Sequence, residues 1–299
     1  MAAPLPYCYF RQTFVEKLNW LSDEEYAQLV ALSQFLPGPG SSQVGFAVGY
    51  KKGGLLGGVL AFIGFTLPSV IIMLVLATLS AELTDLTWFD AVIHGLKLLA
   101  VVVVADATWG MYNNFCKEKA GLALFVFTAT ALLVFPGIAT QIVVLIIAAF
   151  VGMRTLQSEI QPSHGHFKAN WTPLIIFFAL FAGLPFVAHL SLELDIFNSF
   201  FQAGSLVFGG GHVVLPLLQN LVGDQLSPDA FLTGYAAAQA VPGPMFTFAT
   251  YLGYDLMPSM PIFGALMATL AVFLPGFLLL LGFLSIGISL LRYRKSTAH

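Results

Sequence analysis

Long apolar stretches alternate with short polar connections along most of this chain. A helix of about twenty consecutive apolar residues is long enough to cross the hydrocarbon core of a bilayer. The pattern therefore predicts an all-α, polytopic membrane protein with about nine candidate spans, at residues 26–50, 55–80, 91–112, 120–134, 138–153, 173–190, 197–218, 230–254 and 262–290.

Composition supports this prediction. Apolar residues make up 58% of the 299 residues and charged residues only 9%, whereas about a quarter of a soluble domain is charged. The net charge of −3 offers no basic surface for nucleic acid. Cys8 and Cys116 lack the spacing of a metal or redox site. His164 and His166 share one polar connection, but two ligands are fewer than a metal site normally uses, so we expect no metal or cofactor.

A short phrase occurs twice. Residues 34–39 read Gln-Phe-Leu-Pro-Gly-Pro, and residues 239–244 read Gln-Ala-Val-Pro-Gly-Pro, 205 positions later. Each copy follows a Leu-Ser pair and precedes a Gly-Tyr pair and then a Leu-Pro pair. Hydrophobic segments broken by proline and glycine in corresponding positions of two halves are typical of transporter binding sites. The spans around the phrases could be re-entrant instead of crossing fully.

Lysine and arginine predict the orientation, because cytoplasmic loops are enriched in them. Span 55–80 is then directed outward, and its counterpart 262–290 is directed inward. The halves are therefore predicted to be inverted-topology repeats, with the C-terminus in the cytoplasm. The basic stretches assigned to the cytoplasm are 51–52, 117–119, 154–168 and 292–295. We divide the chain into a first repeat with its following helices (1–153), a cytoplasmic linker (154–172) and a second repeat (173–299).

The two halves differ at their starts. In the second half, the predicted helix 197–218 precedes the repeated phrase and contains Phe-Gly-Gly-Gly-His at 208–212. The corresponding positions of the first half are Met1 to Pro6. The first repeat is therefore expected to lack its first helix.

Each Pro-Gly-Pro segment is predicted to end one half-helix and start another. Proline has no backbone N–H, and glycine permits unusual backbone angles. The start of a helix exposes free N–H groups and the positive end of the helix dipole, which suit an anion. Two such starts from inverted halves would bind a tetrahedral oxyanion near the midplane. Alternatively, each segment only kinks a helix, and nearby hydroxyls satisfy the freed carbonyls.

Polar side chains near the two phrases complete this candidate site. The predicted substrate-binding residues are Gln34, Pro37, Gly38, Pro39, Ser41, Ser42, Gln43, Lys97, Gly210, Gly211, His212, Gln239, Pro242, Gly243, Pro244 and Thr247.

Ionisable residues within apolar spans are costly and usually functional. Lys97 and Asp106 both lie in 91–112, about 13.5 Å apart along one helix, which is too far for direct pairing. Lys97 would attract the anion, and Asp106 or His212 would carry a coupling proton. Alternatively, Lys97 and Asp106 extend towards an interface, and His212 is neutral and structural.

These motifs resemble the chromate ion transporter family. The similarity covers nearly the whole chain. Members of this family usually open each half with Phe-Gly-Gly, whereas here only the second half does. The resemblance implies export of chromate across the cytoplasmic membrane, giving chromate resistance, linked to sulfate or to the proton gradient. It is carried by Trp20-Leu21-Ser22, both Pro-Gly-Pro phrases, Ser41-Ser42-Gln43, both Gly-Tyr pairs, Gly95-Leu96-Lys97 and residues 208–212.

We therefore expect a multi-pass protein of the cell membrane that exports chromate by secondary transport. The chain contains no nucleotide-binding loop, so ATP would not be its direct energy source. It also contains no His-Glu-x-x-His or Gly-x-Ser-x-Gly motif, so an enzyme is not expected. Two alternatives stay open: transport of sulfate or another oxyanion, and a truncated membrane protein that transports nothing. An incomplete first half would also be compatible with a homodimer or a partner chain.

Overall fold

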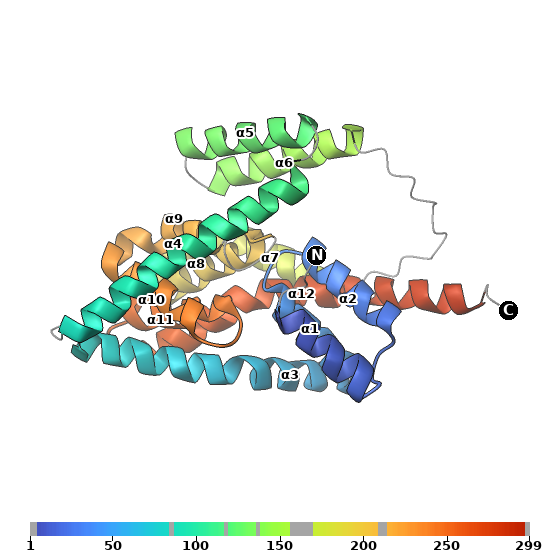
Figure 1. The fold of residues 1–299 in the computed structure, drawn as a ribbon, viewed down its shortest axis with the longest axis horizontal. Helices are drawn as coiled ribbons and strands as arrows, with labels where there is room; N and C mark the ends of the chain where they lie inside the picture. Colours follow the sequence, from blue (N-terminus) through green and yellow to red (C-terminus); the bar gives the residue numbers. More distant parts are fainter. Residues whose placement is uncertain are drawn as a thin grey trace. The chain divides into compact units, whose positions relative to one another are not determined.

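The computed structural model describes residues 5–83, 87–116, 119–135, 138–155, 170–208 and 214–296. Secondary structure in these ranges is helical throughout, with no strand, which confirms the predicted all-α class. The chain forms two compact units, Met1–Lys97 with Gly165–His299 and Leu98–His164. Helix α4 (Thr87–Phe115) begins in the first unit and ends in the second (Figure 1).

The second unit contains two helices that correspond to the predicted spans 120–134 and 138–153. Helices α5 (Lys119–Val134) and α6 (Ile138–Thr155) pack against each other. Residues 136–137 between them lie outside the described residues.

The first unit contains the remaining helices, and α12 packs against α11, α8, α7 and α3. In chain order they are α1 (Leu5–Arg11), the π-helix η1 (Gln12–Lys17), α2 (Asp23–Phe35), α3 (Gly40–Leu83), α7 (Trp171–Val187), η2 (Ala188–Leu190), α8 (Leu192–Leu206), α9 (Val214–Val222), η4 (Gly223–Gln225), α10 (Pro228–Ala240), η5 (Met245–Thr247), α11 (Phe248–Leu256) and α12 (Pro261–Ser296).

Equivalent signals start and stop α2 and α10, which are both 13 residues long. The serine of each Leu-Ser pair is the N-cap: Ser22 accepts from the Glu25 N–H at 3.2 Å, and Ser227 accepts from the Ala230 N–H at 3.1 Å. Such caps satisfy N–H groups that have no partner inside the helix. The C-cap of each helix, Leu36 or Val241, directly precedes a proline, where the α conformation is disfavoured.

The first Pro-Gly-Pro segment (37–39) forms the tip of a helical hairpin. Its two arms are α2 and the beginning of α3, because α3 has non-helical backbone at Gly53 and Gly54. Gly49 lies directly against Gly57, and a Cβ at Gly49 would come within 2.7 Å of the Ala61 Cβ. Since eight residues span about 12 Å of a straight helix, the chain reverses direction at Gly53-Gly54.

The second Pro-Gly-Pro segment (242–244) forms the tip of an equivalent hairpin between α10 and α11. The chain then reverses into α12, and Gly253 lies against Gly264. A Cβ at Gly253 would come within 2.6 Å of the Ala268 Cβ. The two hairpins therefore join their long helices through the same kind of glycine-to-glycine crossing.

These hairpins change the predicted spans. A 13-residue helix is about 20 Å long, which is less than the hydrocarbon thickness of about 30 Å. Spans 26–50 and 230–254 are thus each divided at the proline, and 197–218 is divided into α8 and α9. Among the described residues, three helices are long and apolar enough to cross a membrane: Gly40–Ser80, Trp171–Leu190 and Pro261–Leu284.

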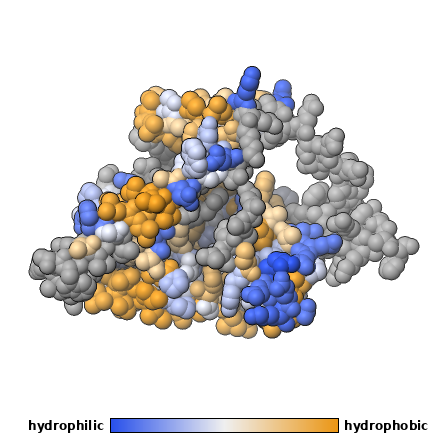
Figure 2. All heavy atoms as spheres, viewed as in Figure 1, coloured by the Kyte–Doolittle hydropathy of each residue, from blue (hydrophilic) through white to orange (hydrophobic). Residues whose placement is uncertain are grey.

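Exposed apolar side chains cover the outside of α3. Leu56, Leu60, Ile63 and Ile71 are each more than 40% exposed, and Figure 2 shows hydrophobic atoms over this helix. So large an apolar surface would be unfavourable in water, and it suits lipid. The helices and this surface support a membrane protein.

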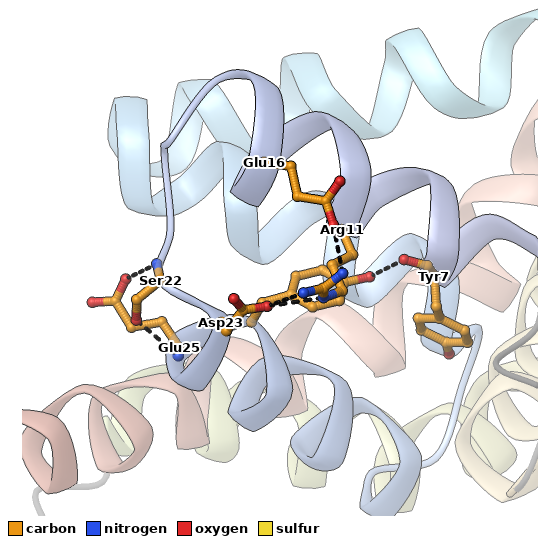
Figure 3. Close-up of polar contacts among 7 residues, drawn as sticks. Tyr7, Arg11, Glu16, Ser22, Asp23 and Glu25 are labelled. Carbon is orange, nitrogen blue, oxygen red and sulfur yellow. Dashed lines mark hydrogen bonds and ion pairs between the residues drawn. The ribbon is translucent and has the colours of Figure 1, made fainter. Parts of the chain in front are cut away.

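The N-terminal segment is fastened to the first hairpin. The Arg11 guanidinium pairs with Glu16 at 2.6 Å and with Asp23 at 2.7 Å, while the Tyr26 hydroxyl donates to the Tyr7 carbonyl at 2.7 Å (Figure 3). Beneath these contacts lies an apolar cluster that joins α1, η1, α2 and α3, formed by Phe10, Val15, Leu21, Tyr26, Val44 and Val48.

Candidate functional site

The two Pro-Gly-Pro segments each contact the long helix of the other hairpin. A Cβ at Gly38 would lie 3.1 Å from the Gly276 Cα in α12, and a Cβ at Gly243 would overlap the Ser69 hydroxyl in α3. Ser69 and Gly276 correspond in the repeat, because each directly follows its Leu-Pro pair. The contacts are therefore reciprocal: the tip of each hairpin meets the same position of the opposite half.

Positive backbone angles explain why glycine occupies both tips. Gly38 has φ +110° and Gly243 has φ +137°, a region that side-chain-bearing residues enter only at a cost. At Gly38 a Cβ would be in tight contact with the backbone of Gly276, and at Gly243, which is exposed, it would displace the Ser69 hydroxyl. The two glycines thus satisfy a conformational and a packing requirement together.

Hydrogen bonds fix the first tip. The Gly38 N–H donates to the Val207 carbonyl at 2.8 Å, at the end of α8. The Gln43 side-chain Nε2 donates to the Pro37 carbonyl at 2.9 Å and to the Gly276 carbonyl at 3.1 Å. A single glutamine therefore links the first tip to the proline-interrupted middle of α12.

The second tip is fixed by hydroxyl groups. The Ser69 hydroxyl donates to the Pro242 carbonyl at 2.7 Å, and the Thr247 hydroxyl donates to the Pro244 carbonyl at 2.9 Å. Ser69 belongs to α3, so this tip is linked to the middle of the opposite long helix as well. The Thr247 hydroxyl donates its proton to a carbonyl of the same segment, so that proton is not available to a ligand.

Three polar atoms near the tips are buried without a hydrogen-bond partner in the described structure: Ser42 Oγ, Gln43 Oε1 and Thr66 Oγ1. Their residues are at most 2% exposed. Ser42 and Gln43 lie in the first turn of α3, and Thr66 lies one turn before Ser69, on the same helix face. Buried polar groups are nearly always hydrogen-bonded, so these three atoms are exceptions within the described structure.

Tyr7 adds a group that the sequence did not indicate. A Cβ at Gly40 would lie 2.6 Å from the Tyr7 hydroxyl, which places this hydroxyl at the start of α3. Burial raises the pKa of Tyr7, and a hydrogen bond with Ser33 opposes that rise. Tyr7 corresponds to His212 in the repeat, 205 positions later.

Several predicted site residues lie at or near the tips, and others do not. Pro37, Gly38, Pro39, Ser42 and Gln43 are buried together at the first tip. The remaining predicted residues differ in their surroundings. At the second tip Pro244 and Thr247 are buried, whereas Pro242 and Gly243 are exposed. Ser41 is half-buried, Gln34 is exposed, Gln239 donates to the Tyr235 hydroxyl at 2.9 Å, and Gly210, Gly211 and His212 lie outside the described residues.

Lys97 is paired with a carboxylate. Its Nζ donates to Asp229 in the first turn of α10, and the Lys97 side chain is 19% exposed whereas that of Asp229 is 83% exposed. The pair links α4 to the start of α10, which is the end of the second hairpin away from its tip. The tip glycines Gly38 and Gly243 take no part in it. Asp106 is exposed and belongs to the second unit.

Asp255 lies near the end of α11, the second arm of the second hairpin, at the position where the first repeat has Lys51. Lys51 pairs with Glu25 at 2.6 Å, whereas the position corresponding to Glu25 in the second repeat is Ala230. Burial raises the pKa of the Asp255 carboxyl to about 6. The second hairpin thus carries a partly buried carboxyl where the first carries an ion pair.

The fold and the reciprocal tips define an α-helical membrane protein whose two halves are broken at matching positions. A family model described as chromate transporter matches residues 4–153 and 194–298. The chain belongs to this chromate transporter family.

Several curated proteins are similar to this chain. A probable chromate transport protein of Synechococcus elongatus is 29% identical over 280 residues, covering 91% of this chain and 68% of its own length. The chromate transport protein of Pseudomonas aeruginosa is 29% identical over 279 residues, covering 89% and 65%. The uncharacterized transporter YwrA of Bacillus subtilis matches 46% of this chain and 77% of its own length, at 26% identity. No solved structure matches the chain.

Proposed function

We propose that this protein is a secondary transporter that exports chromate, a tetrahedral oxyanion, across the cytoplasmic membrane. The observation that carries the proposal is the pair of helix breaks whose tip glycines, Gly38 and Gly243, each meet the opposite long helix. Broken helices of this kind bind anions at the starts of their half-helices. Membership of a chromate transporter family supports chromate as the anion.

The reciprocal contacts also support inverted-topology repeats. When two copies are related by a two-fold axis, a contact from position i to position j recurs as a contact from j to i. The pairs Gly38 with Gly276 and Gly243 with Ser69 have this form. The relative YwrA, which matches 46% of this chain, is compatible with a repeat that also occurs singly. On this proposal the C-terminus lies in the cytoplasm.

The anion would bind at the first tip. The opening N–H groups of α3 have no partner inside the helix, and the Ser42 hydroxyl is buried and unpartnered beside them. The Tyr7 hydroxyl lies next to Gly40. These donors together suit the oxygens of a tetrahedral anion. The positive helix end and the hydroxyls supply hydrogen bonds to the anion, and no Lys or Arg side chain has to be buried beside it.

The test measures survival and intracellular chromium in chromate-sensitive bacterial cells that express the chain. We expect lower intracellular chromium and better survival than in cells with an empty vector. Gly38→Leu should abolish the effect while the protein remains in the membrane, because the side chain cannot fit against Gly276. The matched control is Gly64→Leu, since nothing lies within 4 Å of a Cβ at Gly64, and it should export normally.

Other outcomes would change the assignment. If the inserted wild-type protein leaves chromium unchanged but moves labelled sulfate in proteoliposomes, the substrate is sulfate. If it moves neither anion, the chain is not a transporter by itself. If Gly38→Leu exports as well as wild type, the site does not lie at the first tip.

A further inference from the structure

The long helices α3 and α12 correspond in the repeat, yet they are buried to different extents. Of the most apolar stretch of each helix, 61% is buried in α12 and only 22% in α3. Helices α8 and α7 cover one face of α12. A Cβ at Gly204 of α8 would overlap the Val272 carbonyl, and a Cβ at Gly282 of α12 would overlap a side-chain methyl of α7. The two helices that open the second half therefore fill this face of α12.

The corresponding face of α3 is exposed. The Leu-Pro pairs of the two helices, at 67–68 and 274–275, lie 207 positions apart, so this offset identifies the corresponding residues. The exposed residues, which we call the α3 strip, are Pro68, Ile72, Val75 and Leu79. The counterparts of the first three in α12 are all buried, and they are Pro275, Leu279 and Gly282. Steps of three and four residues place the strip on one side of its helix.

The second tip is exposed beside the α3 strip. Pro242 and Gly243 are both exposed, although the Ser69 hydroxyl holds the Pro242 carbonyl at 2.7 Å. Ser69 directly follows Pro68 of the strip, and it lies midway between the bend in α3 at Gly53-Gly54 and the end of that helix. The tip therefore lies near the middle of a membrane span.

The first tip is covered at the corresponding place. Gly38 is buried, and its N–H donates to the Val207 carbonyl, directly after the last residue of α8. The same helix that fills the face of α12 thus also covers the first tip with its end. The second tip and the α3 strip are open together, because both lie where a counterpart of α8 would pack.

Neither lipid nor water suits this open face as a whole. Broken backbone at membrane depth is tolerated only where protein or a water-filled cavity surrounds it, so the exposed Pro-Gly-Pro segment at 242–244 does not suit lipid. The strip beside it is apolar, and residues 55–81 contain no ionisable side chain, so it does not suit water. A second protein surface satisfies both parts, since it can be apolar along the strip and supply polar backbone groups at the tip.

We propose that the α3 strip and the second tip form the interface with a second copy of this chain. Most oligomers are two-fold dimers, in which the same patch of each copy faces the other. Such a patch must not place like charges opposite each other, and the uncharged strip meets this requirement. In the dimer, α3 of the partner lies where α8 lies in the second half, and it covers Gly243. This inference concerns assembly, so it holds whichever anion the protein carries.

The first experiment counts chains. Fluorescently labelled full chain is reconstituted into liposomes at low protein density, without substrate, and the photobleaching steps of single particles are counted. We expect two steps for wild type. Ile72→Trp should shift most particles to one step, because the larger side chain disturbs the strip. The matched control is Leu270→Trp, which changes an apolar residue of α12 that is 58% exposed, and it should keep two steps. Single steps for wild type would overturn the inference.

Cysteine cross-linking in membranes then locates the interface. In a chain whose Cys8 and Cys116 are replaced by serine, we expect Ile72→Cys, Val75→Cys or Leu79→Cys to form a disulfide-linked species with the mass of two chains, whereas Leu270→Cys should not. Cross-linking at Leu270→Cys alone would place the interface elsewhere. A product with the mass of one chain, or with that of this chain and a different polypeptide, would mean that another segment or partner covers the strip. Each of these results contradicts the inference, and none depends on chromate transport.

Discussion

Replacing Gly243 by alanine tests the contact between the second tip and α3. The change adds one carbon, which would overlap Ser69 Oγ and lie 3.1 Å from Ser69 Cβ. It also forces a residue with a side chain to adopt φ +137°. Both effects act on the hydrogen bond from Ser69 to the Pro242 carbonyl, which is 2.7 Å long.

The expected cost follows from these two effects. A side-chain-bearing residue in such a backbone conformation costs about 1–3 kcal/mol, and loss of the hydrogen bond costs about 1 kcal/mol more. We therefore expect Gly243→Ala to reduce the free energy of unfolding by about 2–4 kcal/mol. Chromate export should fall as well, because the tip can no longer rest against α3.

A second variant relieves the overlap. Ser69→Gly gives α3 the residue that α12 has at the corresponding position, Gly276. Alone it should cost about 2 kcal/mol, from the lost hydrogen bond and from glycine inside a helix. In Gly243→Ala/Ser69→Gly the hydrogen bond is lost only once and the overlap is removed. The double variant should therefore be about 1–2 kcal/mol more stable than the sum of the single effects predicts.

The assay is reversible unfolding in mixed micelles, with export measured in parallel. Gly64→Ala is the control, because a Cβ there has open space around it, and it should be neutral or slightly stabilising. Strict additivity of Gly243→Ala and Ser69→Gly would refute the contact, since residues that do not touch contribute independently.

Three further predictions concern the base of the second hairpin and the helix crossing. If Lys97 acts through its ion pair, Lys97→Met and Asp229→Asn should have similar, non-additive effects on stability. If Lys97 binds the anion, only Lys97→Met should weaken chromate affinity, which radiolabelled chromate binding would show. The pKa of Asp255, at about 6, lies above the usual aspartate value of 3.8, so folding stability should fall as pH rises from about 4 to 6. Asp255→Asn should remove this fall and raise stability at neutral pH by about 1–3 kcal/mol, which thermal unfolding at acidic and neutral pH would detect. Gly253→Ala should destabilise the protein by at least about 1 kcal/mol, whereas Gly183→Ala, with open space at its Cβ, should not; equal stability of both in micelle unfolding would contradict the close crossing.

The sequence determined the local structure of this protein to a large extent. The serines at 22 and 227 start α2 and α10, and the prolines that follow positions 36 and 241 end them. These signals act within one or two helical turns, so they can be found without knowledge of the fold. The repeat of the phrase also identified both tip glycines, which adopt positive φ angles that glycine tolerates.

The sequence located the two breaks, but it left their consequences open. Residues 26–50 are apolar enough to be taken for one crossing helix, yet Pro37 and Gly53-Gly54 divide this region and its continuation into arms of a hairpin. Hydropathy averages over such breaks, since it records polarity and not backbone direction. Lys97 was recognised as costly at depth, but its partner Asp229 was not, because the two lie 132 positions apart.

Only the tertiary structure decided which groups surround the tips. Ser69 and Tyr7 belong to no motif, and Gln43 meets Gly276 across 233 positions of sequence. Such contacts depend on how two hairpins and two long helices pack, and no local propensity encodes that packing. The sequence by itself thus determined the helices, their breaks and the repeated glycines. The reciprocal contacts that bring Gly38 to α12 and Gly243 to α3 arose from packing, because close approach of two backbones is a property of the folded pair and not of either segment.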